Sequence, residues 1–295
     1  MTKKILFKGC GTAISTPFTN DGVNFEALGK LLENQIQNNV DAIIVCGTTG
    51  EASTMTTKEK HDTIKFTVDT VAKRVPVIAG TGGNNTANAI EMCKMAEELG
   101  VDGLLIVTPY YNKTTQNGLI AHYTEIAKNT TLPIIMYNVP SRTGVNILPE
   151  TCFELSKIEN IIAIKEASGN LSQVAKIASL CKENLCIYSG NDDQILPLLS
   201  LGGYGVISVL SNIAPKYTHD MVQNFLDNNI EKAKEMQLNC LNLVDALFCE
   251  VNPIPVKEAL NILGYNYGTP RLPLIELSEK GKNKLISAMK DFGLI

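Results

Sequence analysis

Short apolar runs rich in β-branched residues recur along the first two thirds of this 295-residue chain, and they constrain its fold more than any other feature. From the second run onward they begin every 20 to 34 residues, and helical periodicity fills most of the intervals. The runs are apolar throughout and not only at alternate positions, which is typical of strands covered on both faces. Eight such strands alternating with helices predict an α/β fold, the closed (β/α)8 or TIM barrel. The runs are Gly9–Thr16, Ala42–Cys46, Pro76–Gly80, Gly103–Val107, Pro133–Tyr137, Ile161–Lys165, Leu185–Ser189 and Gly205–Val209.

Helix signals occupy the expected places between and after these runs. Thr56-x-x-Glu59 matches a capping box at the start of a helix. After the eighth unit come three more helical stretches, at about 231–248, 254–263 and 277–291. We therefore expect a catalytic barrel over residues 1–224 and a C-terminal helical region over residues 225–295, packed on the barrel or on a partner.

Composition and charge argue against several other classes of protein. A doubly wound open sheet, the competing α/β fold, would need a nucleotide-binding fingerprint at its first turn, and "KGCGTAIST" is not one. The 30 acidic residues outnumber the 26 basic ones, and no basic stripe is present, which argues against a nucleic-acid partner. The N-terminal apolar run is too short for a signal peptide, and no run reaches membrane-spanning length.

The cysteines and histidines indicate neither disulfides nor a metal site. Eight cysteines lie mostly in apolar segments without Cys-x-x-Cys spacing, the pattern of buried, reduced thiols in a cytoplasmic protein. The three histidines are scattered, and the Asp192-Asp193 pair is too isolated to hold a metal. We therefore expect a cytoplasmic protein without a bound metal ion.

Lys165 ends the sixth run, where four apolar residues lead into an ammonium group. In a strand, Ile161, Ala163 and Lys165 share one face, and we expect Ile162 and Ile164 to face the helices, which leaves Lys165 pointing into the barrel mouth. Barrel enzymes carry their chemistry at this end of the strands. A pKa lowered to about 8 by apolar neighbours would raise the free amine from about one part in a thousand to tens of per cent. Only the free amine attacks a ketone to form an imine. The structural alternative is a lysine that pairs with the glutamate that follows it or extends to the rim.

Other strand ends supply groups for proton transfer and for binding carboxylates. Tyr137, on an adjacent strand end, offers a phenol, and Thr48 and Thr49 offer hydroxyls and N–H groups in a glycine-flanked loop. A chain from Tyr137 through Thr49 to Tyr111 would shuttle a proton without a histidine. Arg142, behind a Val-Pro turn, suits bidentate binding of a carboxylate. Each residue alone has a structural explanation, but together at predicted strand ends they indicate an imine-forming active site.

The motifs that contain these residues resemble those of the dihydrodipicolinate synthase family. They are "GTTGE", "TPYYN", "YNVPSRTG", "IKEASG", "GVISV" and "NPIPVKEAL…RLPL", in the same order over nearly the whole chain. The family is one of the pyruvate-dependent Schiff-base aldolases on a (β/α)8 barrel, which include N-acetylneuraminate lyase. The resemblance implies condensation of pyruvate with aspartate-4-semialdehyde to 4-hydroxy-tetrahydrodipicolinate, the first committed step of diaminopimelate and lysine biosynthesis, with no cofactor.

The same resemblance implies a role for each residue of the relay. Lys165 would form the imine with pyruvate, and Tyr137 would give and take protons. Thr49 would hold the pyruvate carboxylate and join Thr48 and Tyr111 in the proton relay. Tyr111 would reach into the site of a neighbouring subunit, which implies a homotetramer built as a dimer of dimers.

Three further residues are implied in substrate binding. Ile207 would offer its backbone carbonyl near the imine, and Gly190 would line the pocket. Arg142 would bind the carboxylate of aspartate-4-semialdehyde, and lyases for bulky sugar acids lack "SRTG" at this place. Another pyruvate-dependent aldolase or lyase is the alternative enzyme. A non-catalytic binding barrel would have lost the lysine, the tyrosine or the arginine, and none is lost.

The sequence departs from the family in the region linked to feedback inhibition by lysine. Inhibited members usually carry histidines at the helix start after the second strand and a glutamate after the third strand's loop. Here the matching positions hold Thr57, Lys60 and Asn88, although Asn84 and Tyr110 fit the pattern. The loss of a carboxylate and the gain of Lys60 disfavour a cationic ligand. We therefore predict weak or absent inhibition by lysine.

Overall fold

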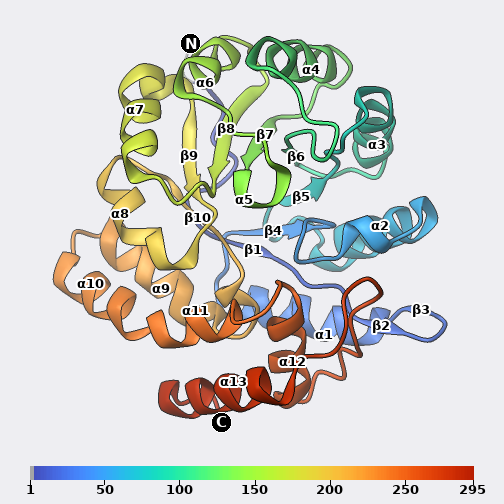
Figure 1. The fold of residues 1–295 in the computed structure, drawn as a ribbon, viewed down its shortest axis with the longest axis vertical. Coiled ribbons are helices and arrows are strands. Elements are labelled where there is room, and N and C mark those ends of the chain that lie inside the picture. Colours follow the sequence, from blue (N-terminus) through green and yellow to red (C-terminus); the bar gives the residue numbers. More distant parts are fainter. Residues whose placement is uncertain (1–2) are drawn as a thin grey trace.

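The computed structural model of this protein describes residues 3–295 and contains a closed barrel of eight parallel strands (Figure 1). Met1 and Thr2, at the start of the predicted 1–224 region, lie outside the described residues. Around the barrel the order is β1-β10-β9-β8-β7-β6-β5-β4, and β4 closes on β1. The predicted (β/α)8 barrel is confirmed. Its strands are β1 (Gly9–Ala13), β4 (Ala42–Val45), β5 (Val77–Gly80), β6 (Gly103–Val107), β7 (Ile134–Asn138), β8 (Ile161–Glu166), β9 (Cys186–Ser189) and β10 (Gly205–Ser208).

The first predicted run, Gly9–Thr16, is shorter as a strand because β1 ends at Ala13. A small antiparallel hairpin follows it, formed by β2 (Phe18–Thr19) and β3 (Gly22–Val23). The N–H of Phe18 donates to the carbonyl of Tyr267 over 3.1 Å, which joins the hairpin to the C-terminal region.

Helices cover the outside of the barrel (Figure 1). The predicted capping box opens α2: the Thr56 hydroxyl accepts from the N–H of Glu59, and the Glu59 carboxylate accepts from the N–H of Thr56. The helices up to the last strand and just after it are α1 (Phe25–Gln37), α2 (Thr57–Val71), α3 (Thr86–Glu98), α4 (Gln116–Lys128), α5 (Pro140–Thr143), α6 (Pro149–Ser156), α7 (Leu171–Cys181), α8 (Ile195–Ser200) and α9 (Pro215–Leu226). Short 3-10 turns are η1 (Ala52–Thr54), η2 (Lys182–Asn184), η3 (Asp192–Gln194) and η4 (Leu210–Asn212).

Four helices form the C-terminal region: α10 (Ile230–Asn239), α11 (Leu241–Leu247), α12 (Ile254–Ile262) and α13 (Glu279–Phe292). The helical stretch predicted over 231–248 is present, but it is divided at Cys240 into α10 and α11. The two halves pack on different partners, α10 on α9 and α11 on α13, so a single straight helix could not serve both. Figure 1 shows α11, α12 and α13, coloured orange to red, along the lower part of the molecule.

Apolar side chains form one cluster inside the barrel and a larger one between the strands and the helices. Ile164 faces the helices and Ala163 faces the interior, as the alternation predicts. Ile161 and Ile162 are reversed relative to the prediction: Ile161 lies in the outer cluster and Ile162 in the inner one. The cause is a register shift beside Ile134, where β8 pairs with β7 irregularly. Alternation resumes after the shift, so Lys165 still faces inward.

The eight cysteines, which all lie within residues 3–295, are unpaired, and seven of them are buried. The predicted burial of most of the cysteines is confirmed. Across the same residues, no helix is both long enough and apolar enough to span a membrane.

Candidate active site

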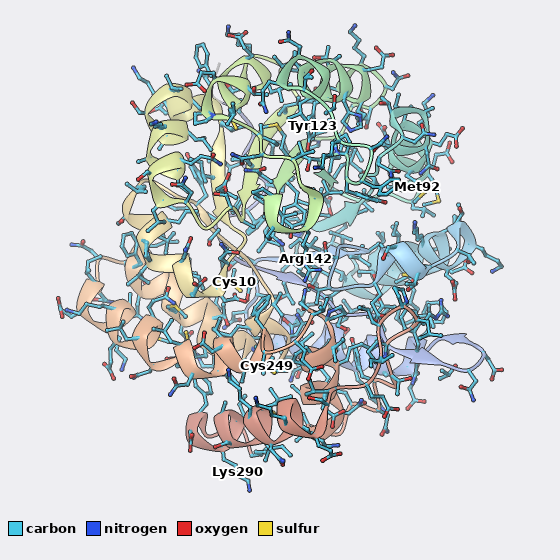
Figure 2. The ribbon with its side chains drawn as sticks, in the orientation of Figure 1. Cys10, Met92, Tyr123, Arg142, Cys249 and Lys290 are labelled. Atoms are coloured by element: carbon cyan, nitrogen blue, oxygen red, sulfur yellow. The ribbon has the colours of Figure 1, made fainter. Side chains whose placement is uncertain are left out.

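A cavity of about 310 Å³ opens at the C-terminal ends of the barrel strands. Thr48 reaches it from the loop after β4, Tyr137 from the end of β7, and Arg142 from the short helix α5 that follows β7. In Figure 2 Arg142 lies near the middle of the molecule, close to α5. Three of the predicted site residues therefore share one cavity.

Lys165 lies next to this cavity, buried against Tyr137. In the strand register Lys165 is flanked by Tyr137 on β7 and by Tyr188 on β9. Its Nζ lies 4.5 Å from the centre of the Tyr137 ring, and only 5% of the residue is exposed. Burial lowers the pKa of Lys165 to about 8. The charge of Asp192 opposes this shift, and the charge of Arg142 adds to it. A substantial fraction of the amine is therefore unprotonated near neutral pH.

A purely structural role for Lys165 would be an ion pair with Glu166, the residue that follows it. Glu166 instead accepts from Asn138 Nδ2 over 2.9 Å and from the N–H of Ser168 over 2.7 Å. Because successive strand residues face opposite sides, the two side chains diverge. Glu166 thus organises the loop after β8 and leaves the Lys165 amine to the barrel interior.

Gly190 lies against the Lys165 side chain, at the end of β9. A Cβ atom placed there would lie 2.7 Å from the Ala167 Cβ and 3.0 Å from the Lys165 Cε. Neither distance is compatible with ordinary packing, for which carbon atoms stay about 3.5–4.0 Å apart. The absence of a side chain at Gly190 is therefore what lets the lysine extend to its present place.

Tyr137 combines burial with polar neighbours. Burial raises the pKa of its phenol, while Arg142 and a hydrogen bond with Thr48 both act to lower it. The phenol stays protonated near neutral pH and has a hydroxyl partner. Tyr137 and Thr48 can therefore pass a proton beside the Lys165 amine.

Thr49 and Arg142 are joined through a residue to which the sequence analysis gave no role. Asn252 Nδ2 donates to Thr49 Oγ1 over 3.1 Å, and Arg142 Nη2 donates to the Asn252 carbonyl over 3.1 Å. Asn252 is 5% exposed, and its Oδ1 has no partner among the described residues. It lies within the quoted motif "NPIPVKEAL", but a position about 200 residues from Thr49 gives no local signal of this contact.

Asp192 is the second residue whose place the sequence did not predict. Its Oδ2 accepts from the N–H groups of Val209 and Leu210 over 3.0 and 2.9 Å, which fixes the loop that follows β10. Ile207, on β10, is fully buried in the inner cluster. Asp192 therefore holds the segment just beyond Ile207, and its carboxylate acts to raise the pKa of the Lys165 amine.

Tyr111 differs from the buried site residues because its side chain lies at the surface, outside the cavity. It is 91% exposed and has a left-handed backbone with φ of 68°. Thr49, by comparison, is 3% exposed. A side chain in solvent is not in contact with the buried hydroxyl of Thr49 in the same chain, so the proposed relay needs Tyr111 from another subunit or a movement of its loop.

One side of the cavity extends away from Lys165, toward the region compared above with lysine-inhibited enzymes. Lys60, Asn84, Asn88 and Tyr110 line it, whereas Thr57 is not among the lining residues. Within the described chain, none of the lining residues carries a carboxylate. The cations Lys60 and Arg142 give the cavity a positive character.

The fold and the site define a class of protein: a (β/α)8 barrel with a buried, partly unprotonated lysine at the C-terminal strand ends, as in aldolases that work through a lysine imine. The model of the Dihydrodipicolinate synthetase family matches residues 6–292. The chain belongs to this family.

Individual relatives are similar over nearly their whole length. The 4-hydroxy-tetrahydrodipicolinate synthase 1 of Clostridium acetobutylicum is 58% identical over 98% of this chain and 99% of its own. The dihydrodipicolinate synthase structure from Thermotoga maritima superposes with a TM-score of 0.97 at 43% identity, covering 99% of this chain and all of that one. The enzyme from Cyanidioschyzon merolae, solved with lysine bound, has a TM-score of 0.96 at 42% identity, over 99% and 100% of the two chains.

Proposed function

We propose that this protein condenses pyruvate with aspartate-4-semialdehyde and releases 4-hydroxy-tetrahydrodipicolinate. The observation that carries the proposal is the Lys165 amine, buried beside Tyr137 with a pKa of about 8. An amine in this state attacks a keto carbon, and Arg142 in the adjoining cavity can bind the carboxylate of the second substrate. The product leads to diaminopimelate and lysine.

The reaction follows from these groups in three steps. The Lys165 amine adds to the keto carbon of pyruvate, and water leaves to give the imine. Loss of a methyl proton gives an enamine, whose carbon attacks the aldehyde of aspartate-4-semialdehyde and forms the new carbon–carbon bond. The substrate's own amino group then displaces Lys165 from the imine carbon and closes the ring. One water is released in total, and the lysine is regenerated.

Tyr137 and Thr48 carry out proton transfer, and other residues of the site bind the substrate. Tyr137 protonates the leaving hydroxyl of the first adduct and takes protons back later, with Thr48 as its neighbour in the relay. Thr49 holds the pyruvate carboxylate with its hydroxyl and its backbone N–H. Gly190 and the backbone carbonyl of Ile207 line the pocket around the imine.

Self-association as a homotetramer, a dimer of dimers, would complete the relay. The exposure of Tyr111 supports this proposal, because its ring lies free of its own site and is available to a neighbouring subunit. We also propose that residues 1–224 act as the catalytic barrel, that residues 225–295 form a C-terminal helical region packed on it, and that the enzyme works in the cytoplasm.

The test is pyruvate consumption by purified protein after addition of aspartate-4-semialdehyde, with N-acetylmannosamine as the parallel acceptor. Rapid consumption with the semialdehyde alone is expected. Consumption only with the sugar would instead indicate another pyruvate-dependent aldolase. Borohydride reduction in the presence of pyruvate should add mass to the peptide that carries Lys165, and labelling elsewhere would refute the assigned nucleophile.

A further inference from the structure

Glu51 closes the loop that presents Thr48 and Thr49, and its backbone is left-handed, with φ of 53°. This conformation is unfavourable for a residue with a Cβ atom and persists only where its surroundings hold it. Glu51 is 2% exposed, so the groups that hold it are buried with it.

Those groups come from the far end of the chain. Lys257 Nζ lies 2.7 Å from Glu51 Oε1, and both side chains are only 1% exposed. The N–H of Arg271 donates to Glu51 Oε2 over 2.9 Å, so both carboxylate oxygens have partners. Lys257 Nζ also donates to the carbonyl of Thr269 over 3.2 Å and lies 4.3 Å from the centre of the Phe18 ring.

The same C-terminal segment contacts the catalytic loop a second time. Asn252, five positions before Lys257, hydrogen-bonds to Thr49 and accepts from Arg142. The segment before α12 and the first turn of α12 thus reach the loop after β4 at two points, Thr49 and Glu51. Figure 1 shows the C-terminal helices on the side of the barrel that carries α1 and the β2–β3 hairpin.

Stability alone gives a poor account of this ion pair. Replacing a buried ion pair by apolar side chains of similar volume is often neutral or stabilising, because both charges lose their hydration on burial. Charged, hydrogen-bonded partners fix the orientation of a residue, which apolar partners do not. Here they fix the orientation of Glu51, a strained residue two positions from Thr49.

We propose that the Glu51–Lys257 ion pair is a positioning device that holds Thr48 and Thr49 in reach of Tyr137 and of the pyruvate carboxylate. The proposal rests on the proposed function, because it assigns the pair a task in that reaction. Neither residue lines the cavity, so both act through the threonines. The C-terminal helical region is on this view part of the catalytic apparatus.

The test is the double variant Glu51→Gln with Lys257→Met, which removes both charges and keeps both shapes. The single variant Lys257→Met would leave a buried carboxylate unpaired and would disturb folding as well. For the double variant we expect the kcat of condensation, counted per site that borohydride traps with pyruvate, to fall about tenfold or more, and the KM for pyruvate to rise several-fold. The KM for the semialdehyde should change least.

The matched control is Glu33→Gln with Arg74→Met, which removes an exposed ion pair in the same way. It should leave kcat and both KM values unchanged. A double variant at 51 and 257 that loses thermal stability but keeps wild-type kcat and KM per trapped site would overturn the proposal, because the pair would then be purely structural. The wild-type protein in the same assay separates the two ideas: if it fails to turn over, the proposed function fails, whereas a defect confined to the variant concerns the ion pair.

Discussion

Replacing Gly190 by alanine is the sharpest test of how Lys165 is placed. The added Cβ would lie 2.7 Å from the Ala167 Cβ, 3.0 Å from the Lys165 Cε and 3.2 Å from the Lys165 Cγ. The optimal separation of carbon atoms is about 3.5–4.0 Å, so the nearest contact is short by roughly 1 Å. Gly190 has a backbone conformation open to any residue, so the effect comes from this contact alone.

The neighbours must move to make room, and the end of the lysine chain is the part most able to do so. A displacement of about 1 Å at a reacting group costs about 100-fold in rate, which corresponds to about 2.7 kcal/mol of transition-state stabilisation. Overpacking of this kind also costs about 1–3 kcal/mol of folding free energy, or a few degrees in Tm. We therefore expect Gly190→Ala to fold, to melt slightly earlier and to lose about two orders of magnitude in kcat/KM.

The assay is the initial rate of condensation, together with the rate at which borohydride traps pyruvate on Lys165. The control is Gly83→Ala, which adds a Cβ to the wall of the same cavity, because a Cβ there meets nothing within 4 Å and its backbone is equally unrestricted. Gly83→Ala should keep the wild-type trapping rate. If Gly190→Ala traps pyruvate as fast as the wild type, the added Cβ does not displace Lys165. The proposed role of Gly190 in placing the lysine is then refuted.

Three further predictions concern the titration of the site, its acid and its regulation. Because the charged form of Lys165 is favoured only below its pKa of about 8, the trapping rate should fall about tenfold per pH unit below that value and level off above it; a profile flat from pH 6 to 9 would contradict the assigned pKa. Tyr137→Phe should keep the fold but lower kcat by about 10²- to 10⁴-fold, since the proton donor is lost; an unchanged kcat would remove Tyr137 from the mechanism. Lysine at sub-millimolar concentration should leave the rate nearly unchanged, because Lys60 repels a cation and Asn88 supplies no charge; strong inhibition in that range would show that the cavity accepts a cation after all.

Local pattern was enough to predict the frame of the molecule. The spacing of apolar runs predicted eight barrel strands, and the capping box at Thr56 predicted the start of α2. The order of the runs also predicted that Lys165 and Tyr137 lie on adjacent strand ends, and in the structure they pair at the ends of β8 and β7. These features depend on residues close together in sequence and on a repeating topology, so they can be read without coordinates.

Where local pattern conflicts with packing, packing decides. The alternation along β8 predicted the wrong faces for Ile161 and Ile162, because a register shift against β7 is set by the neighbouring strand and not by the run itself. The apolar periodicity over 231–248 likewise predicted the helical stretch but not its division at Cys240, where α10 packs on α9 and α11 packs on α13. Both differences come from contacts between elements.

Side-chain identity and a short repeat are enough to predict the barrel and the chemical character of its strand ends. The way those ends are held depends on contacts that form only in the folded protein. Asn252 meets Thr49, and Lys257 meets Glu51, across separations of 203 and 206 residues. No local pattern encodes such contacts, because they exist only once the closed barrel brings the C-terminal helices against the loop after β4. The exposure of Tyr111 likewise depends on the folded surface, because the sequence identifies the side chain as a tyrosine but does not show which groups surround it.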